Sequence, residues 1–397
     1  MDTQNTPIHI NLWHRDFWFL AMANMLLTIA VYMLIPVQPL WLLKVMHLTG
    51  EQVGLIMGSY GIGLFLFGPF VSYLVQEYRR NEVCIFSLCG MVIVLGGMYF
   101  VQDRMLLNKL CVWHFVAWRV LLGACFGLAH MVLTSTLIID KCESFQRTEA
   151  NHSASWFGRF GISIGPMVGL LVVQYTSPQQ WGTMICFAAV ICIVIAYLLI
   201  RSVSFPFRAH EDNLPKVSLD RFFLPQGKWL FLNLIMVTTI LGLVMSMGHT
   251  PKFYAIIMAG FLLAILAEKY AFADANLKSE TITGLLLMGT AFLIMLTRRQ
   301  VTVEYIAPFF IGFGIGIIGS RFLLFFLKLS KHCQRGTSQS TFFLAWESGI
   351  SLGLFLGYAV FYQRTHELLW CGLALTVVAL LFYNFFTHGW YVRHKNR

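Results

Sequence analysis

Four ionisable residues lie deep inside long apolar stretches of this 397-residue chain, namely Arg119, Arg159, Arg321 and Glu347. A charge at the centre of a bilayer costs ~2.5–3.5 kcal/mol on insertion scales, so each needs a partner, a water-filled cavity or a function. A buried carboxylate can take up and release a proton, and an arginine can neutralise it or bind an anion. The four residues therefore predict a pathway for ions or polar solutes.

Two of these charges occupy equivalent positions in an internal repeat. The stretch WFGRFGISIGPMVG at 156–169 is repeated as LAWESGISLGLFLG at 344–357, and Arg159 in the first copy becomes Glu347 in the second. The shared residues are Gly161, Ile162, Ser163, Gly165 and Gly169, which match Gly349, Ile350, Ser351, Gly353 and Gly357. Internal duplication with charges at matching membrane depth is typical of a secondary transporter.

Two arginines at the same expected membrane depth are candidate ion-pair partners of Glu347. Arg321 is level with it and could form a static ion pair between adjacent helices. Arg159 could instead face it across a central pathway, and the pair would then form and break as the two halves move. Removal of an arginine increases the proton affinity of a carboxylate, which is the physical basis of proton exchange. His130, level with Arg159, is a further candidate proton carrier, although a lone histidine more often hydrogen-bonds a neighbouring helix.

The embedded charges also indicate a cargo. Three arginines against one clearly embedded carboxylate give the pathway an excess of positive charge. Such a pathway favours an anionic or zwitterionic small molecule over a lipophilic cation. We expect protons to be the coupling ion.

The composition requires a membrane. Hydrophobic residues make up 58% of the chain and charged residues only 12%, about half the charged fraction of a soluble protein. The net charge of +10 does not indicate nucleic-acid binding, because the positive residues lie in short loops between apolar stretches. The nine cysteines show no metal-type spacing, and neither HExxH nor a phosphate-binding loop occurs. We therefore expect no cofactor, no metal and no enzymatic activity.

Twelve apolar stretches are long enough to cross ~30 Å of hydrocarbon as helices. They predict an all-α integral membrane fold with spans at 17–43, 51–76, 83–102, 110–139, 150–175, 181–200, 228–248, 252–271, 280–297, 303–328, 338–362 and 367–387.

Lysine and arginine set the expected orientation. Eighteen of them fall on the side of the two termini, seven on the other side and three inside spans. Positive residues favour the cytoplasm, so both termini are expected there, in a multi-pass protein of the cell (inner) membrane. The Pro-containing segment 202–227 predicts a cytoplasmic linker between two six-helix halves, 1–201 and 228–397. We expect a monomer.

Three motifs in this arrangement resemble those of the major facilitator superfamily, and the resemblance covers essentially the whole chain. The loop between spans 2 and 3 carries Gln76, Glu77, Arg79 and Arg80, where the family has an Asp-Arg pair followed by basic residues. That Asp is implicated in a cytoplasmic latch between the halves. Because Gln76 holds no charge, either the latch is absent or Glu77 has taken it over.

The other two motifs lie in spans 4 and 5. Arg119, Gly123 and Gly127 resemble the family's Arg-x-x-x-Gly-x-x-x-Gly element, whose arginine is implicated in ion coupling. Gly161, Gly165, Pro166 and Gly169 resemble a motif of bacterial proton-coupled exporters, and Gly349, Gly353 and Gly357 are its second copy. The resemblance implies two pseudo-symmetric halves and a cavity lined by spans 1, 4, 7 and 10. Polar residues inside spans then become cavity candidates: Asn24, Gln38, Asn233, Thr238 and Trp346.

The leading interpretation is export of a small molecule by proton antiport through alternating access. Proton-coupled uptake of a small, possibly anionic metabolite is the alternative on the same fold. A non-transporting membrane protein or a membrane enzyme is more remote, because neither explains the duplicated embedded charges.

Overall fold

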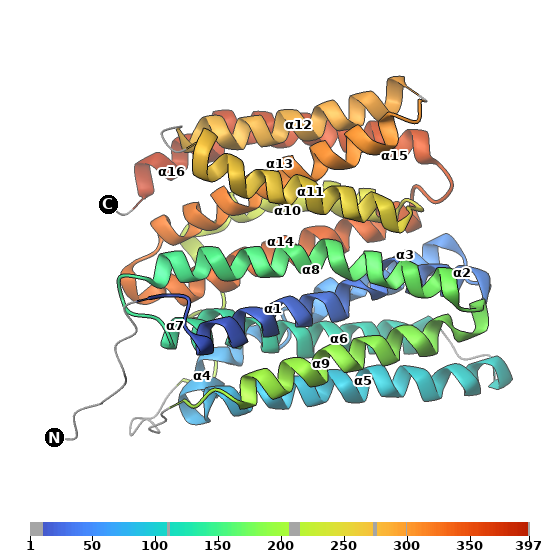
Figure 1. Ribbon diagram of the computed structural model, residues 1–397, viewed down its shortest axis with the longest axis horizontal. Coiled ribbons are helices and arrows are strands. Elements are labelled where there is room, and N and C mark those ends of the chain that lie inside the picture. Colours follow the sequence, from blue (N-terminus) through green and yellow to red (C-terminus); the bar gives the residue numbers. More distant parts are fainter. Residues whose placement is uncertain (1–10, 109–111, 206–214, 273–275, 299, 396–397) are drawn as a thin grey trace.

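The computed structural model describes residues 11–108, 112–205, 215–272, 276–298 and 300–395, and within these it contains helices but no strand (Figure 1). Twelve helical spans are long and apolar enough to cross a membrane. The predicted all-α fold with twelve spans is therefore confirmed. Helices satisfy every backbone hydrogen bond within one segment, which hydrocarbon requires.

The first six spans are formed by α1 (Arg15–Tyr32) with α2 (Leu34–Lys44), α3 (Gly50–Gly63) with α4 (Val71–Glu77), α5 (Arg80–Asn108), α6 (Val112–Val132) with α7 (Ile138–Asp140), α8 (Arg147–Tyr175) and α9 (Trp181–Arg201). The last six are formed by α10 (Lys228–Ser246), α11 (Pro251–Leu266), α12 (Leu277–Thr297), α13 (Val303–Leu329), α14 (Arg335–Ala359), and α15 (Thr365–Phe382) with α16 (His388–His394). π-Helical turns extend α6, α11 and α15, at Leu133–Leu137, Ala267–Ala271 and Tyr383–Thr387.

Two helices extend beyond the predicted spans. The third span was expected to end at 102 and the twelfth at 387, but α5 reaches Asn108 and α16 reaches His394. Hydropathy marks where the apolar stretch ends, whereas a helix can continue into polar sequence.

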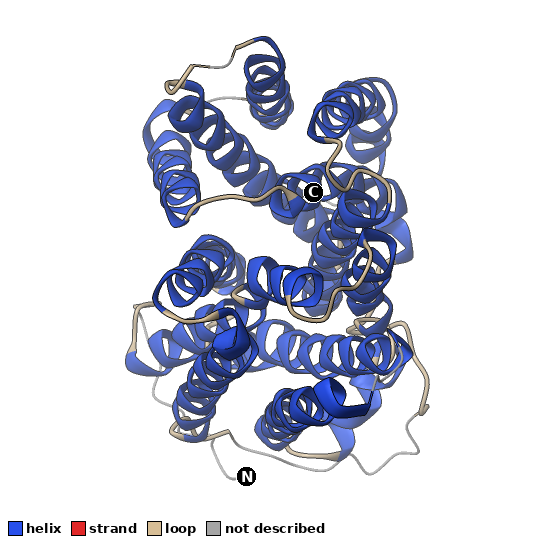
Figure 2. Ribbon diagram, turned by 90° about the vertical axis from the view of Figure 1, so that its right-hand side faces the viewer, coloured by secondary structure: helices blue, strands red, loops and turns tan. Residues whose placement is uncertain are grey.

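The helices run roughly parallel to the long axis of the molecule, and both termini lie at the same end (Figure 1). We call this end the termini side. In the same view α10–α13 and α15 lie above α1–α7 and α9, with α8 and α14 between the two groups. Viewed along the helices, the bundle shows these groups as two clusters (Figure 2).

The repeated glycines pack equivalent pairs of helices. α8 packs against α1, where a Cβ on Gly165 would lie 2.8 Å from Cβ of Tyr32. α14 packs against α10, where a Cβ on Gly353 would lie 2.2 Å from the carbonyl oxygen of Thr239. Small residues let two backbones approach closely in a membrane. Of the other glycines of these motifs, Gly161 likewise meets α1, Gly169 meets Met33 and Val37 where α1 passes into α2, and Gly349 and Gly357 meet α10.

A third glycine seam closes the side opposite the termini. Here α3 of the first six spans packs against α14 of the last six. A Cβ on Gly50 would lie 2.8 Å from the carbonyl oxygen of Tyr358, and one on Gly54 would lie 2.6 Å from the amide of Ala359. Side chains larger than hydrogen would hold these helices apart, so this end of the central pathway is sealed by backbone contact.

Candidate functional site

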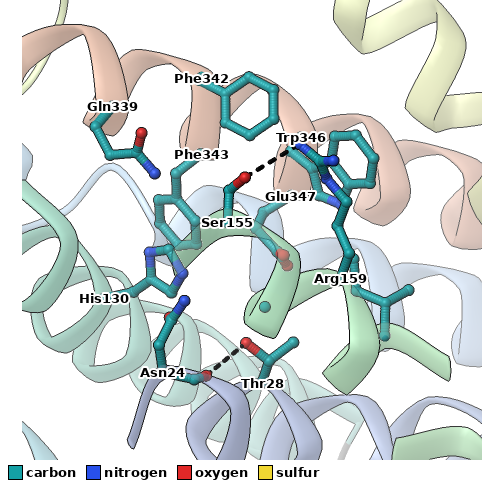
Figure 3. A pocket seen from close by; sticks show the side chains of 12 residues that line it. Asn24, Thr28, His130, Ser155, Arg159, Gln339, Phe342, Phe343, Trp346 and Glu347 are labelled. Atoms are coloured by element: carbon teal, nitrogen blue, oxygen red, sulfur yellow. Dashed lines mark hydrogen bonds between the residues drawn. The ribbon is translucent and has the colours of Figure 1, made fainter. Parts of the chain in front are cut away.

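A small cavity of about 40 Å³ lies between the two sets of six spans (Figure 3). It lies between α1, α6 and α8 of the first six spans and α14 of the last six. Its lining residues are Asn24, Thr28, His130, Ser155, Gly158, Arg159, Ile162, Gln339, Phe342, Phe343, Trp346 and Glu347. A water molecule needs ~10–15 Å³ of such volume, so the cavity in this conformation holds a few waters but no metabolite. Binding of a larger cargo requires opening.

Glu347 is the only carboxylate on the described wall of this cavity. Its residue is 5% exposed, and its Oε1 accepts a hydrogen bond from the Tyr32 hydroxyl at 2.8 Å. Among the described residues it forms no ion pair. Both pairings expected from the sequence, with Arg321 and with Arg159, are therefore wrong for this conformation. A phenol of α1 occupies the position of the expected cation.

Arg159 is held by uncharged groups. Its Nη2 donates to Ser155 Oγ at 3.2 Å and its Nη1 to the carbonyl oxygen of Gly316 at 3.4 Å. Its guanidinium carbon lies 4.3 Å from the centre of the Trp156 ring, and Nε has no hydrogen-bond partner in the described structure. The Gly316 contact joins α8 to α13 across the two sets of six spans. An arginine without a carboxylate partner remains free to bind an acidic group of a cargo.

Arg321 pairs with a carboxylate that sequence reasoning had placed at a membrane edge. Its Nε lies 2.5 Å from Oε2 of Glu280, whose side chain is 1% exposed. Glu280 lies in the first turn of α12, which packs against α13. Permanent charges buried together in this way are typical of a structural ion pair.

The expected excess of positive charge is also wrong. The side chain of Glu268, at the end of the eighth span, is 8% exposed. Together with Glu280 it raises the number of embedded carboxylates to three, equal to the number of embedded arginines. The numbers of embedded arginines and carboxylates are therefore balanced and do not favour an anionic cargo.

His130 lies in the cavity wall and stacks on Phe343 of α14, with ring centres 3.9 Å apart and planes inclined by 12°. Its Nδ1 has no hydrogen-bond partner among the described groups. Asn24 donates from Nδ2 to the carbonyl oxygen of Ala154, which joins α1 to α8 at the edge of the cavity. His130, Asn24 and Trp346 are thus brought together with Arg159 and Glu347.

Several predicted site residues lie away from this cavity. Arg119 is buried between α6 and α3, where its Nη2 contacts the sulfur of Met57 at 2.9 Å. Asn233 donates to the carbonyl oxygen of Ala379, and Thr238 donates to that of Ala345 at 3.3 Å. Gln38 borders a separate small space near α9. The expectation that Gln38, Asn233 and Thr238 line the central cavity is therefore wrong, because their sides of the helices face neighbouring helices.

Other lining residues were missed, although a signal for two of them exists. Ser155 lies one helical turn before Arg159, and Gln339 lies two turns before Glu347, so each shares a helix face with an embedded charge. The helical period, counted from Arg159 and from Glu347, therefore identifies Ser155 and Gln339 as residues of the same helix faces. Thr28 and Tyr32 lie one turn apart on α1, and no sequence feature relates them to α14.

A second, wider cavity of about 610 Å³ opens nearer the termini side. It is lined by Trp13, Trp18, His152, Ser153, Trp156, Phe157, Phe160, Ile265, Glu268, Lys269 and Arg321. On α8, Ser155 and Arg159 face the central cavity, whereas His152 and Trp156 face the wider one. One helix therefore separates the two spaces.

A linker carboxylate lies where the family-type latch was expected. Asp220 accepts hydrogen bonds from Ser72 Oγ at 3.3 Å and from Thr337 Oγ1 at 3.0 Å, and so connects α4 with α14. Gln76 supports this contact by donating to Ser72 Oγ at 2.8 Å. Glu77 is exposed. The carboxylate that joins these helices comes from a loop distant in the chain.

Basic residues surround this contact. Arg80 forms an ion pair with Asp140, and Arg79 lies 3.8 Å from Glu82. Burial lowers the pKa of Arg221, the positive charge of Arg80 lowers it further, and Asp220 partly opposes both. Arg221 has a φ of 56°, and its amide donates to Thr337 Oγ1. The linker thus turns sharply at the residue after Asp220.

Replacing Asp220 with alanine is expected to release the linker from both helices. Two side-chain hydrogen bonds are lost, at about 1 kcal/mol each, so amide hydrogen exchange in residues 215–224 becomes faster. Asp220→Asn keeps one acceptor oxygen and should have a smaller effect. Glu77→Gln is the matched control, because that carboxylate is exposed. Equal hydrogen exchange in Asp220→Ala and Glu77→Gln would show that the contacts of Asp220 do not stabilise the linker.

Most of the chain matches a known protein family. The family model described as Major Facilitator Superfamily matches residues 20–354. A protein of Escherichia fergusonii described as an uncharacterized MFS-type transporter, YcaD, is 24% identical over 195 residues, which cover 48% of this chain and 47% of that protein. The chain thus matches about half the length of this curated relative.

Solved structures with a similar fold come from transporters of different cargo. The human organic anion transporter MFSD10 has a TM-score of 0.63 at 13% identity, covering 93% of this chain and 98% of its own. An auto-inhibited peptide transporter of the POT family has a TM-score of 0.68 at 11% identity, covering 97% and 98%. The nucleoside transporter NupG has a TM-score of 0.67 at 12% identity, covering 95% and 100%. Such identities establish the shared fold and leave the cargo open.

Proposed function

Because the chain belongs to the Major Facilitator Superfamily, we propose that it is a proton-coupled antiporter that exports a small molecule by alternating access. Its transporter fold is shown by the twelve spans and the matching structures. The proposal concerns the coupling ion, the direction of transport and the cargo. The observation that carries the proposal is Glu347, a buried carboxylate at a central cavity without a cationic partner in the described structure.

The environment of Glu347 suits a proton-carrying group. An isolated carboxylate in a water-poor cavity is costly unless a proton or a cation neutralises it. Tyr32, its hydrogen-bond partner, lies on α1, whereas Glu347 lies on α14. A rocking movement of the first six spans against the last six would separate the two and hydrate the carboxylate. The proton would then leave to, or arrive from, whichever side is open.

The cavity wall supports a small cargo that carries an acidic group. Arg159 has a free Nε and only uncharged hydrogen-bond partners among the described residues. Asn24, Ser155 and Gln339 offer further polar groups. Phe342, Phe343 and Trp346 form an aromatic part of the same wall. An anionic or zwitterionic molecule with a planar apolar part would satisfy Arg159 and pack against these rings.

Direction is supported by two features of the chain. The Gly165-Pro166 pair belongs to a motif that resembles those of exporters, and Gly165 packs directly against α1. The positive-inside rule favours the cytoplasm for the termini side, with the chain in the inner membrane of the cell. The wider cavity lies nearer to this side, from which an exporter collects its cargo.

The proposal is tested by comparing small molecules inside and outside cells that express the chain with those of cells that carry an empty vector. We expect one compound or chemical class to be enriched outside and depleted inside. Enrichment inside would support uptake by symport and overturn the proposed direction. The absence of any difference across growth media would contradict export of a cellular metabolite.

A further inference from the structure

His152 and Glu268 connect the first six spans to the last six at the wider cavity. His152 Nε2, on α8, lies 3.4 Å from Oε2 of Glu268 at the end of the eighth span. The same nitrogen lies 2.9 Å from Ser320 Oγ on α13. The imidazole thus bridges to two helices of the other set of six spans. These contacts lie where α8 meets α11 and α13.

The charged residues around this contact do not replace the histidine as a partner of Glu268. Arg321 is paired with Glu280 at 2.5 Å. Lys269 is exposed and its Nζ lies over the Tyr270 ring. Arg159 is bound to Ser155 and Gly316, and Glu149, one turn before His152 on α8, is exposed. Among the described residues, the ion-pair partner of Glu268 is therefore an imidazole.

An imidazole differs from a permanent cation because it loses its charge near physiological pH, whereas an arginine does not. The Glu268 side chain is only 8% exposed, and its Oε1 has no hydrogen-bond partner in the described structure. The His152 side chain is 36% exposed and borders both the wider cavity and a neighbouring space of about 320 Å³. The histidine is therefore the more exposed member of the pair, and the carboxylate is the buried one.

We infer that His152 and Glu268 form a proton-dependent bridge that holds the termini side of the transporter closed. With the proton present, an imidazolium donates to a carboxylate and α8 is held to α11 and α13. When the proton leaves, a neutral imidazole faces a buried carboxylate, the bridge weakens and this side opens. The role of the bridge in transport rests on the proposed proton coupling.

Loss of the proton would leave the termini side open, which is the state in which an exporter collects its cargo. Arg321 and Glu280 lie beside the bridge as a pair of opposite charges. They join α12 to α13 and do not contact His152 in the described structure.

The test is amide hydrogen exchange of the intact chain in lipid nanodiscs, at about pH 5.5 and about pH 8, on either side of the ordinary histidine pKa. Labelling times are scaled to the chemical exchange rate at each pH. We expect residues 148–160 and 262–271 to exchange about tenfold faster at the higher pH, the effect of losing one charge-assisted contact. His152→Gln and Glu268→Gln should both exchange quickly at both pH values.

Glu149→Gln is the matched control and should respond as the wild type does. Residues 238–246 of α10, in a glycine seam, report global folding and should be unchanged in every variant. A wild type without the pH response, or a Glu268→Gln chain that keeps it, would overturn the bridge. Glu347→Gln should keep the exchange response, because Glu347 lies outside the bridge. A wild type that shows the exchange response but no pH-driven transport would count against the proposed function and not against the bridge.

Discussion

Replacing Glu347 with glutamine is expected to abolish the driving of transport by a pH gradient while cargo exchange continues. Glutamine has the same size and can still accept a hydrogen bond from Tyr32, but it cannot bind a proton in the transport cycle. In proteoliposomes, gradient-driven accumulation should fall by about 100-fold, the lower range for removing a proton-transferring group. Exchange of labelled for unlabelled cargo needs no net proton movement and should remain within about threefold of wild type.

Tyr32→Phe provides a graded comparison for this result. It removes the hydrogen bond to Glu347 but leaves the proton-binding carboxylate in place. We expect reduced but measurable gradient-driven accumulation, because the loss of one hydrogen bond to a charged group costs about 1.5–3 kcal/mol. Accumulation by Glu347→Gln at the wild-type level would exclude this residue as the proton carrier.

Replacing Gly353 with alanine is expected to cause a large loss of stability. Its Cβ would lie 2.2 Å from the carbonyl oxygen of Thr239 and 2.7 Å from the Cα of Gly242. Both contacts are with backbone, which cannot rotate away, so α14 and α10 must separate. Overpacking of this kind costs about 3 kcal/mol. The loss should appear as a lower melting temperature and a smaller folded fraction in detergent.

Gly96→Ala is the matched control for this prediction. A Cβ added to Gly96 on α5 meets nothing within 4 Å, so the same chemical change adds no clash. Its only expected effect is a gain of up to about 1 kcal/mol from helix propensity. Equal melting temperatures for the Gly353 and Gly96 variants would contradict the close contact between α10 and α14.

The sequence predicts the twelve spans because hydrocarbon allows few alternatives. A stretch of about 20 apolar residues has to cross as a helix, so composition alone locates it. The glycine seams were also visible, since the repeated spacing of Gly161 and Gly165 places both on one helix face. These predictions depend on position along a helix and on period, which the sequence contains directly.

Which residues face the cavity was harder to predict. Asn233 and Thr238 lie in α10, which is apolar on every side, so its hydropathy does not define a rotation about the helix axis. Both turned out to face neighbouring helices. By contrast, the internal repeat relates Arg159 to Glu347, and the two residues line one cavity without forming an ion pair with one another. Depth follows from the sequence, whereas pairing depends on tertiary packing.

The two carboxylates at span ends show a second limit. Glu268 and Glu280 lie where apolar sequence meets polar sequence, and sequence alone does not show whether such an end is covered by another helix. The contact of Asp220 with Ser72 joins residues far apart in the chain, one of them in a loop without a period. Such contacts become visible only once the helices are assembled.

The most direct measurement is the direction of proton movement when cargo moves down its own gradient. Proteoliposomes would enclose a pH-sensitive dye and receive a cargo gradient of the compound found in the cell comparison, without an imposed pH difference. We predict that protons move against the flow of cargo in the wild type and that this movement is absent in Glu347→Gln. Protons that move with the cargo would show symport, and cargo flow without proton movement would contradict proton coupling.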